Sequence, residues 1–306
     1  MAQLTEAGRS ARPRHSTLPP TAGRRRVKAG GAGKQQNAGP VAYVLLIVAA
    51  AISLFPLYWT VVAASHTDTD ITQPPTPLLP GSHLVQNLKV VWDEVDMTTA
   101  LINSTIVAGC VAVSTVLFAT LAGFAFAKLR FRGRNILLMI VVATMTIPPQ
   151  LSVIPLYQII TNVGWVGHLQ SVILPSLVAA FGVFFMRQFL SEALPIELIE
   201  AARVDGAHSL RILWHVVFPI ARPAMAVLGM LVFVQAWNDF FWPLIALNQQ
   251  NPTVQVALAG VGSGNHAIDH AAVVTAALVA TLPLLLVFAF LGKHIVGGIT
   301  AGAVKS

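Results

Sequence analysis

The chain has 306 residues, of which 55% are hydrophobic and 10% are charged, whereas soluble domains average about 45–50% and about 25%. A soluble core could not bury so many apolar side chains, so the composition predicts a polytopic membrane protein. The formal net charge of +7 lies in residues 1–40, which hold eight Lys or Arg and one acid. The remaining residues hold 11 of each sign, which excludes a nucleic-acid-binding face.

Residues 1–40 are rich in Gly, Ala and Pro and show no helical periodicity. This composition predicts a disordered basic tail, and its Lys and Arg would keep the N-terminus in the cytoplasm. The alternative is a secretory signal, because Ala63-Ala64-Ser65 resembles a cleavage site. The apolar stretch from Val41 to Ala64 is longer than the ~7–15 residues of a signal core. We therefore interpret it as an uncleaved anchor.

The fold class predicted for residues 41–306 is an all-α membrane domain with six transmembrane helices. A span needs about 20 apolar residues, and the third candidate span contains Pro148, Pro149 and Pro155. Such a span is expected to be broken and to line a water-filled path, where its freed carbonyls can be satisfied. Cys110 is expected to be buried as a small apolar side chain. The six spans are expected at 41–64, 101–127, 136–160, 169–189, 224–246 and 271–291.

The second span is expected to pack closely against its neighbours, because small side chains let helix backbones approach one another. The small residues are Gly109, Ala112, Ser114, Ala119, Ala122 and Gly123.

The distribution of Lys and Arg predicts the orientation of the spans. With the N-terminus inside, 18 of the 19 basic residues fall in cytoplasmic segments, and only Lys89 falls outside. This bias is typical of plasma-membrane proteins. Both termini and the loop between the fourth and fifth spans are therefore expected in the cytoplasm.

That loop reads E-A-A-R-V-D-G-A from Glu200 to Ala207. Pro195 suits the first turn of a helix, and residues 196–202 are good helix formers. Gly206 is placed to end this helix in a left-handed conformation. A second short helix is expected from about Ser209 to Val216. The pattern predicts a compact helix–turn–helix.

The loop resembles the EAA signature of the integral-membrane subunits of ABC importers, in which E-A-A is followed by three residues, G and a distal L-P. Phe218 stands where the family often has leucine. From Val41 onward the chain resembles the second permease of carbohydrate importers, the maltose-type G subunit. For Glu200, the alternative is a surface acid paired with Arg203. The resemblance implies that seven residues couple to an ATPase: Glu200, Ala201, Ala202, Asp205, Gly206, Ala207 and Pro219.

The resemblance also implies partners. The chain would be a permease subunit and not an enzyme, pairing with a different permease and docking two ATPase subunits. An extracellular or periplasmic sugar-binding protein would contact the outer segments 65–100 and 247–270, whose alternative is plain solvated connectors. No cofactor is expected, because the chain lacks the glycine-rich Lys-Ser/Thr loop that binds nucleotide phosphates. ATP would be bound by the ATPase.

The expected solute is a di- or oligosaccharide, with a cellobiose-type sugar as the first hypothesis. The alternative within the class is an importer of glycerol phosphate or a polyol. A secondary transporter would need buried ion-coupling acids and two related halves, and the sequence shows neither.

A polar and aromatic cluster near the end of the fifth span is the candidate solute path. It comprises Trp237, Asn238, Asp239 and Phe240. Tryptophan can stack on a sugar face, while amide and carboxylate oxygens can accept hydrogen bonds from sugar hydroxyls. The alternative is that the cluster packs helices together.

A metal site is not predicted. His266, Asp269 and His270 could place two imidazoles on one helical face. A metal needs three or four ligands and an organised surrounding shell.

Overall fold

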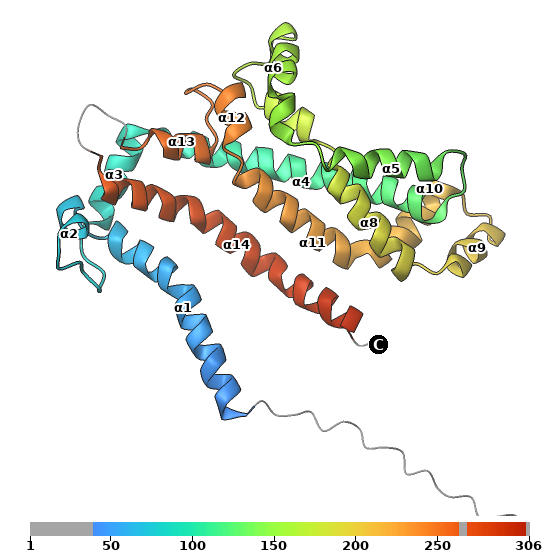
Figure 1. Ribbon diagram of the computed structural model, residues 1–306, viewed down its shortest axis with the longest axis horizontal. Coiled ribbons are helices and arrows are strands. Elements are labelled where there is room, and N and C mark those ends of the chain that lie inside the picture. The colour runs from blue at the N-terminus through green and yellow to red at the C-terminus, as the bar shows by residue number, and fades with distance from the viewer. Residues whose placement is uncertain (1–38, 263–267, 304–306) are drawn as a thin grey trace, which may run out of the picture. The chain divides into compact units, whose positions relative to one another are not determined.

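The computed structural model describes residues 39–262 and 268–303 (Figure 1). These residues form helices and contain no strand, which confirms the all-α class. Residues 1–53 and 54–306 form two separate units, so the packing described below concerns residues from Leu54 onward. The tail predicted for residues 1–40 lies almost wholly outside the described residues.

Five helical stretches of the described chain are long and apolar enough to cross a membrane, and a bent pair can supply a sixth span. The long stretches are α1 (Pro40–Ala64), α4 (Met97–Lys128), Gln170–Ala193, Ser209–Trp237 and α14 (His270–Ala303). The bent pair is α5 (Arg134–Thr144) with η1 (Pro149–Ser152) and α6 (Val153–Asn162). Shorter helices are α2 (Asp68–Thr72), α3 (Leu84–Glu94), α9 (Ile196–Val204), α12 (Phe241–Ala246) and α13 (Val254–Gly260).

The core is built around α4, which packs against α8 (Ala180–Ala193) and α11 (Phe218–Trp237), while α11 also packs against α14 (Figure 1). At Gly123 the helices are so close that a Cβ atom would lie 2.8 Å from the Met186 Cβ. Ala119 is fully buried. Two of the small residues therefore permit close packing, as expected.

The other face of α4 is uncovered. Gly109 has no neighbouring heavy atom within 4 Å of an added Cβ, and Cys110 is exposed. The expectation of a buried Cys110 was wrong, because the helices that pack on α4 leave this face open.

The third span is broken, as its prolines predicted. Its two halves meet at an angle of 92°. Pro148 and Pro149 lie at the bend and cannot donate backbone hydrogen bonds, so the α5 ladder cannot continue through them. No residue of α5 is buried within the described chain.

The fourth span is less regular than expected. It consists of α7 (Gln170–Ile173), the 3-10 turn η2 (Leu174–Ser176) and α8, and it ends at Ala193. Pro175 lies within the 3-10 turn, because its ring and missing N–H disfavour an α-helical ladder at this point.

The short helix expected from Ser209 to Val216 does not end there. α10 (Ser209–Ile212) continues through a π-helical segment, η3 (Leu213–Val217), into α11 as one stretch. A π turn widens the backbone, which relieves the clash of Pro219 with the carbonyl four residues earlier. The N-cap of α10 is His208, whose Nδ1 accepts the Arg211 N–H at 3.4 Å.

The fifth span ends at Trp237, earlier than the expected residue 246. Asn238 caps it, since its side-chain Nδ2 donates to the Val234 carbonyl at 2.8 Å. Short polar side chains of this kind compete with the helical ladder. After the break, α12 begins at Phe241.

Candidate functional site

The first candidate site is the α9–α10 element, residues 196–212. The predicted end of α9 is present in detail: Gly206 has φ +79°, and its N–H donates to the Arg203 carbonyl at 3.0 Å. The Ala207 N–H donates to the Ala202 carbonyl at 2.9 Å. These two bonds form a Schellman motif, which fixes the direction of the chain between α9 and α10.

The α9–α10 element is anchored by one face and free on the other. Ile199 is 1% exposed within the core, and Ala202 and Ala207 pack against that core. On the outward side, Val204 is 89% exposed and Leu210 is 62% exposed. Single exposed apolar residues are ordinary, but a cluster on a short anchored element is typical of a contact surface.

The remaining motif residues are solvent-facing. Glu200, Ala201 and Asp205 are exposed, and Pro219 is exposed in the first turn of α11. Among the described side chains of residues 39–262 and 268–290 the only ion pairs involve histidine. Glu200 therefore forms no ion pair with Arg203 there, and its coupling role stays a prediction.

Replacing Gly206 is expected to impair the α9–α10 element through its backbone alone. No atom lies within 4 Å of a Cβ added at Gly206, so steric packing does not contribute. A left-handed conformation costs an L-residue roughly 1–2 kcal/mol, less for asparagine and more for β-branched residues. Transport by purified, reconstituted complexes should fall in the order Gly206, Gly206→Asn, Gly206→Ala, Gly206→Val. Equal transport by the Asn and Val variants would contradict this account.

The second candidate site is a cavity of about 540 Å³. It lies among α4, the broken third span, the turns before α8 and the end of α11. Polar lining side chains include Thr115, Gln150, Ser152, Gln235 and Asp239, while the rest are mainly apolar. A mostly apolar cavity with a few polar groups is the usual form of a small-molecule site.

Of the four residues predicted for the solute path, Asp239 lines this cavity. It is half-buried in the break between α11 and α12, and its carboxylate lies near the backbone N–H groups of Trp242 and Phe241. Asn238 and Phe240 are exposed, and the Asn238 Oδ1 accepts the Gln255 Nε2–H at 3.3 Å. The structure therefore brings a carboxylate, but not the whole cluster, to the cavity.

Trp237, the fourth predicted path residue, is not among the residues that line this cavity. It is 1% exposed, its Nε1–H donates to the Ala280 carbonyl at 3.2 Å, and its ring stacks on Phe233 at 5.8 Å. The hydrogen bond to Ala280 joins α11 to α14. This placement corresponds to the helix-packing alternative for this residue.

Sequence reasoning did not assign Gln150, Ser152 or Gln235 to the cavity. The signal that could have found them is their polarity within otherwise apolar membrane-length segments, where an uncompensated polar group is costly. Their convergence depends on the 92° bend of the third span.

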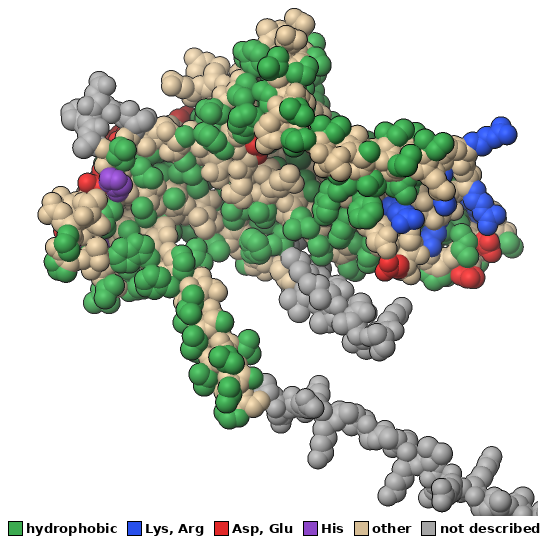
Figure 2. Space-filling model, in the orientation of Figure 1, with side chains coloured by type: hydrophobic (Ala, Val, Ile, Leu, Met, Phe, Trp, Pro, Cys, Tyr) green, Lys and Arg blue, Asp and Glu red, His purple; other side chains and the backbone are tan. Residues whose placement is uncertain are grey.

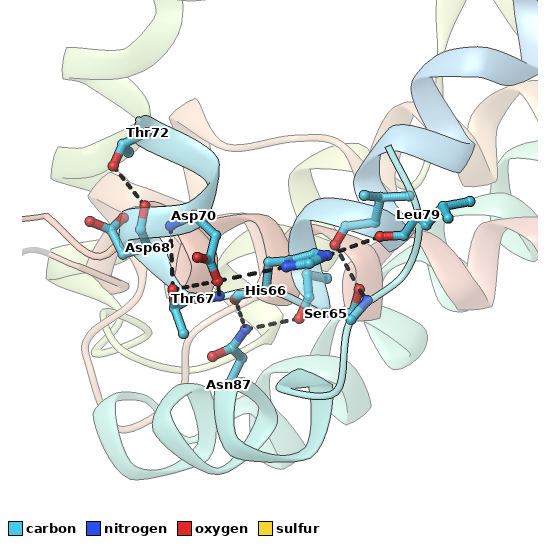
Figure 3. Close-up of polar contacts among 11 residues, drawn as sticks. Ser65, His66, Thr67, Asp68, Asp70, Thr72, Leu79 and Asn87 are labelled. Atoms are coloured by element: carbon cyan, nitrogen blue, oxygen red, sulfur yellow. Dashed lines mark hydrogen bonds and ion pairs between the residues drawn. The ribbon is translucent and has the colours of Figure 1, made fainter. Parts of the chain in front are cut away.

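The first of the two outer segments is folded and not a plain connector (Figure 3). The Asn87 Nδ2 donates to the carbonyls of Ala64 at 2.9 Å and His66 at 2.8 Å. The Thr67 hydroxyl and backbone N–H donate to the Asp70 carboxylate at 2.7 and 3.2 Å. These bonds hold the pKa of the Asp70 carboxyl below its ordinary value.

The two outer segments are joined to each other. Asp68 accepts the His270 backbone N–H at 2.7 Å and contacts the His270 ring at 3.1 Å. The Gly262 N–H donates to the Glu94 carboxylate at 2.8 Å. Asp269 accepts the Ala272 N–H at 3.0 Å, whereas His266 lies outside the described residues. The two segments thus form one surface.

Comparison with known proteins identifies the family to which the chain belongs. A family model for the binding-protein-dependent transport system inner membrane component matches residues 116–300, which include the α9–α10 element and most of the residues that line the cavity. The chain belongs to this family. As a binding-protein-dependent inner membrane component, it is an ABC importer permease embedded in the inner membrane, and its relatives are transport permeases rather than enzymes.

Relatives of this inner membrane component include the sn-glycerol-3-phosphate transport system permease protein UgpE of Yersinia enterocolitica. It is 33% identical over 227 residues, which cover 72% of this chain and 80% of the relative. UgpE of Pectobacterium atrosepticum is 32% identical over 267 residues, which cover 84% of this chain and 94% of that relative. A bacterial ABC transporter involved in the import of the acidic polysaccharide alginate has a similar fold, with a TM-score of 0.70 and 24% identity over 83% of this chain and 94% of that one.

Proposed function

We propose that the α9–α10 element is the docking surface for an ATPase and that the cavity containing Asp239 is part of the solute path. The proposal rests on one continuous helical stretch that connects the two sites. The stretch Ser209–Trp237 begins within the α9–α10 element and ends beside the cavity. A movement imposed on the docking surface would therefore reach the cavity through a single helix.

The proposed orientation places the α9–α10 element in the cytoplasm. Figure 2 shows Lys and Arg side chains gathered at the end of the molecule that carries α9 and α10. The basic residues there come from the α4–α5 connection and from α8 to α11, and Lys89 belongs to α3. Basic residues favour the cytoplasmic side, where ATP is available. The joined outer segments would then face a solute-binding protein.

For the solute, we favour the glycerol-phosphate or polyol class over a cellobiose-type sugar. The support comes from the relatives, which are glycerol-3-phosphate permeases. Among the described residues that line the cavity, the only ionisable one is Asp239. A phosphorylated solute would therefore need positive charge from the partner permease, whereas an uncharged polyol would not.

The test is uptake by the full importer, reconstituted in vesicles with its second permease, ATPase and binding protein. Labelled glycerol 3-phosphate, glycerol and cellobiose are compared at equal concentration. Uptake of either glycerol compound, driven by ATP, supports the proposed class. Uptake of cellobiose alone would restore the disaccharide hypothesis.

A further inference from the structure

A second recess lies outside the two candidate sites, at the connection between α4 and α5. Its volume is about 450 Å³, and it is lined by Arg130, Phe131, Gly133, Arg134, Asn135 and Ile136. The connection lies at the same end of the molecule as the end of α8, because the Lys128 Nζ donates to the Ser191 carbonyl at 3.1 Å.

The charge of this recess is not neutralised within the described chain. Among residues 39–262 and 268–290, no Lys or Arg forms an ion pair with an acid. Arg130 is exposed. Arg134 is half-buried, and its guanidinium contacts only neutral acceptors, the Leu129 carbonyl at 3.4 Å and the Asn135 Oδ1 at 3.5 Å. Two guanidinium groups beside one recess suit an anion with several acceptor oxygens, such as a phosphate.

The surroundings of the recess are apolar and exposed. Phe131 is 40% exposed and Ile136 is 60% exposed, and α5 continues from the recess with no buried residue. The recess therefore lies where an apolar segment of a membrane span meets its polar flank. At this depth the phosphates of lipid headgroups lie beside acyl chains.

We propose that the recess binds the phosphate of an anionic phospholipid headgroup, with Arg130 and Arg134 as its ligands and the exposed face of α5 along the acyl chains. This site is separate from solute transport and does not depend on the identity of the solute. A basic residue near an anionic lipid surface contributes about 1 kcal/mol, which corresponds to roughly a fivefold change in affinity.

The test uses the full chain purified within its importer complex and titrated with phosphatidylglycerol or phosphatidylcholine, with bound lipid counted by native mass spectrometry. Arg130→Gln and Arg134→Gln should each weaken phosphatidylglycerol binding about fivefold and leave phosphatidylcholine binding unchanged. Arg134→Lys should retain most of the affinity, which separates a loss of charge from a loss of folding. The matched control is Arg132→Gln, on the same connection but outside the recess lining.

Three outcomes would overturn the proposal. Equal weakening by all three glutamine variants would indicate diffuse attraction and not a site. Displacement of phosphatidylglycerol by millimolar inorganic phosphate would indicate a site for a soluble anion. Unchanged lipid binding together with loss of the ATPase from the complex would indicate that the connection contacts the partner protein.

Discussion

Replacing Glu200 with lysine is expected to abolish solute-stimulated ATP hydrolysis while the subunit still inserts and assembles. Glu200 is exposed and has no ion pair within the described chain, so its charge is available to a partner. Reversing a charge at a docking surface can cost several kcal/mol, and we expect a fall of about tenfold or more in the stimulated rate. The measurement is ATPase activity of the reconstituted importer with and without solute.

The matched control is Glu197→Lys. Glu197 is also exposed on α9 but precedes the E-A-A motif. It should reduce the stimulated rate much less than Glu200→Lys does. If the Glu200→Lys importer transports normally at wild-type abundance, Glu200 has no role in coupling.

Trp237→Ala and Asp239→Ala are expected to fail in different ways, although the two residues are neighbours. Trp237 is buried between α11 and α14, and removing a buried tryptophan costs about 3–5 kcal/mol. This variant should lower the yield and thermal stability of the complex. Asp239 lines the cavity, so its alanine variant should assemble and lose uptake.

Assembled yield and uptake in vesicles are measured for both variants, with Asp239→Asn as the conservative control. Asparagine keeps the size and one side-chain acceptor oxygen of Asp239 but removes the charge. Uptake lost in both Asp239 variants at normal yield would indicate that the carboxylate acts in the path. Loss of yield in both would instead indicate that Asp239 serves to hold α12.

The sequence predicted the parts of the fold that depend on local chemistry. Six apolar stretches gave the spans, consecutive prolines gave the break in the third span, and Gly206 gave the end of α9. Each follows from a property of nearby residues: length, a missing N–H, or tolerance of a positive φ.

The parts that the sequence did not predict depend on contacts between distant residues. Apolar residues resume at Phe240, directly after Asn238 and Asp239, so hydropathy averaged over a span could not separate the two helices. The sequence places Trp237 and Asp239 in one cluster. In the structure the helix ends between them, so Trp237 packs in the core and Asp239 lines the cavity. The π-helical segment likewise has no distinct composition.

The unbroken path from α10 to α11 has a mechanical consequence. At 1.5 Å per residue, the stretch Ser209–Trp237 is roughly 43 Å long, with no loop in which displacement could be absorbed. A tilt of about 5° at one end would shift the other end by roughly 4 Å. If the α9–α10 element docks the ATPase as proposed, the displacement at the cavity would be set by the angle at which that element is held. In such an importer, the displacement at the cavity would be proportional to the movement that the ATPase imposes on α10.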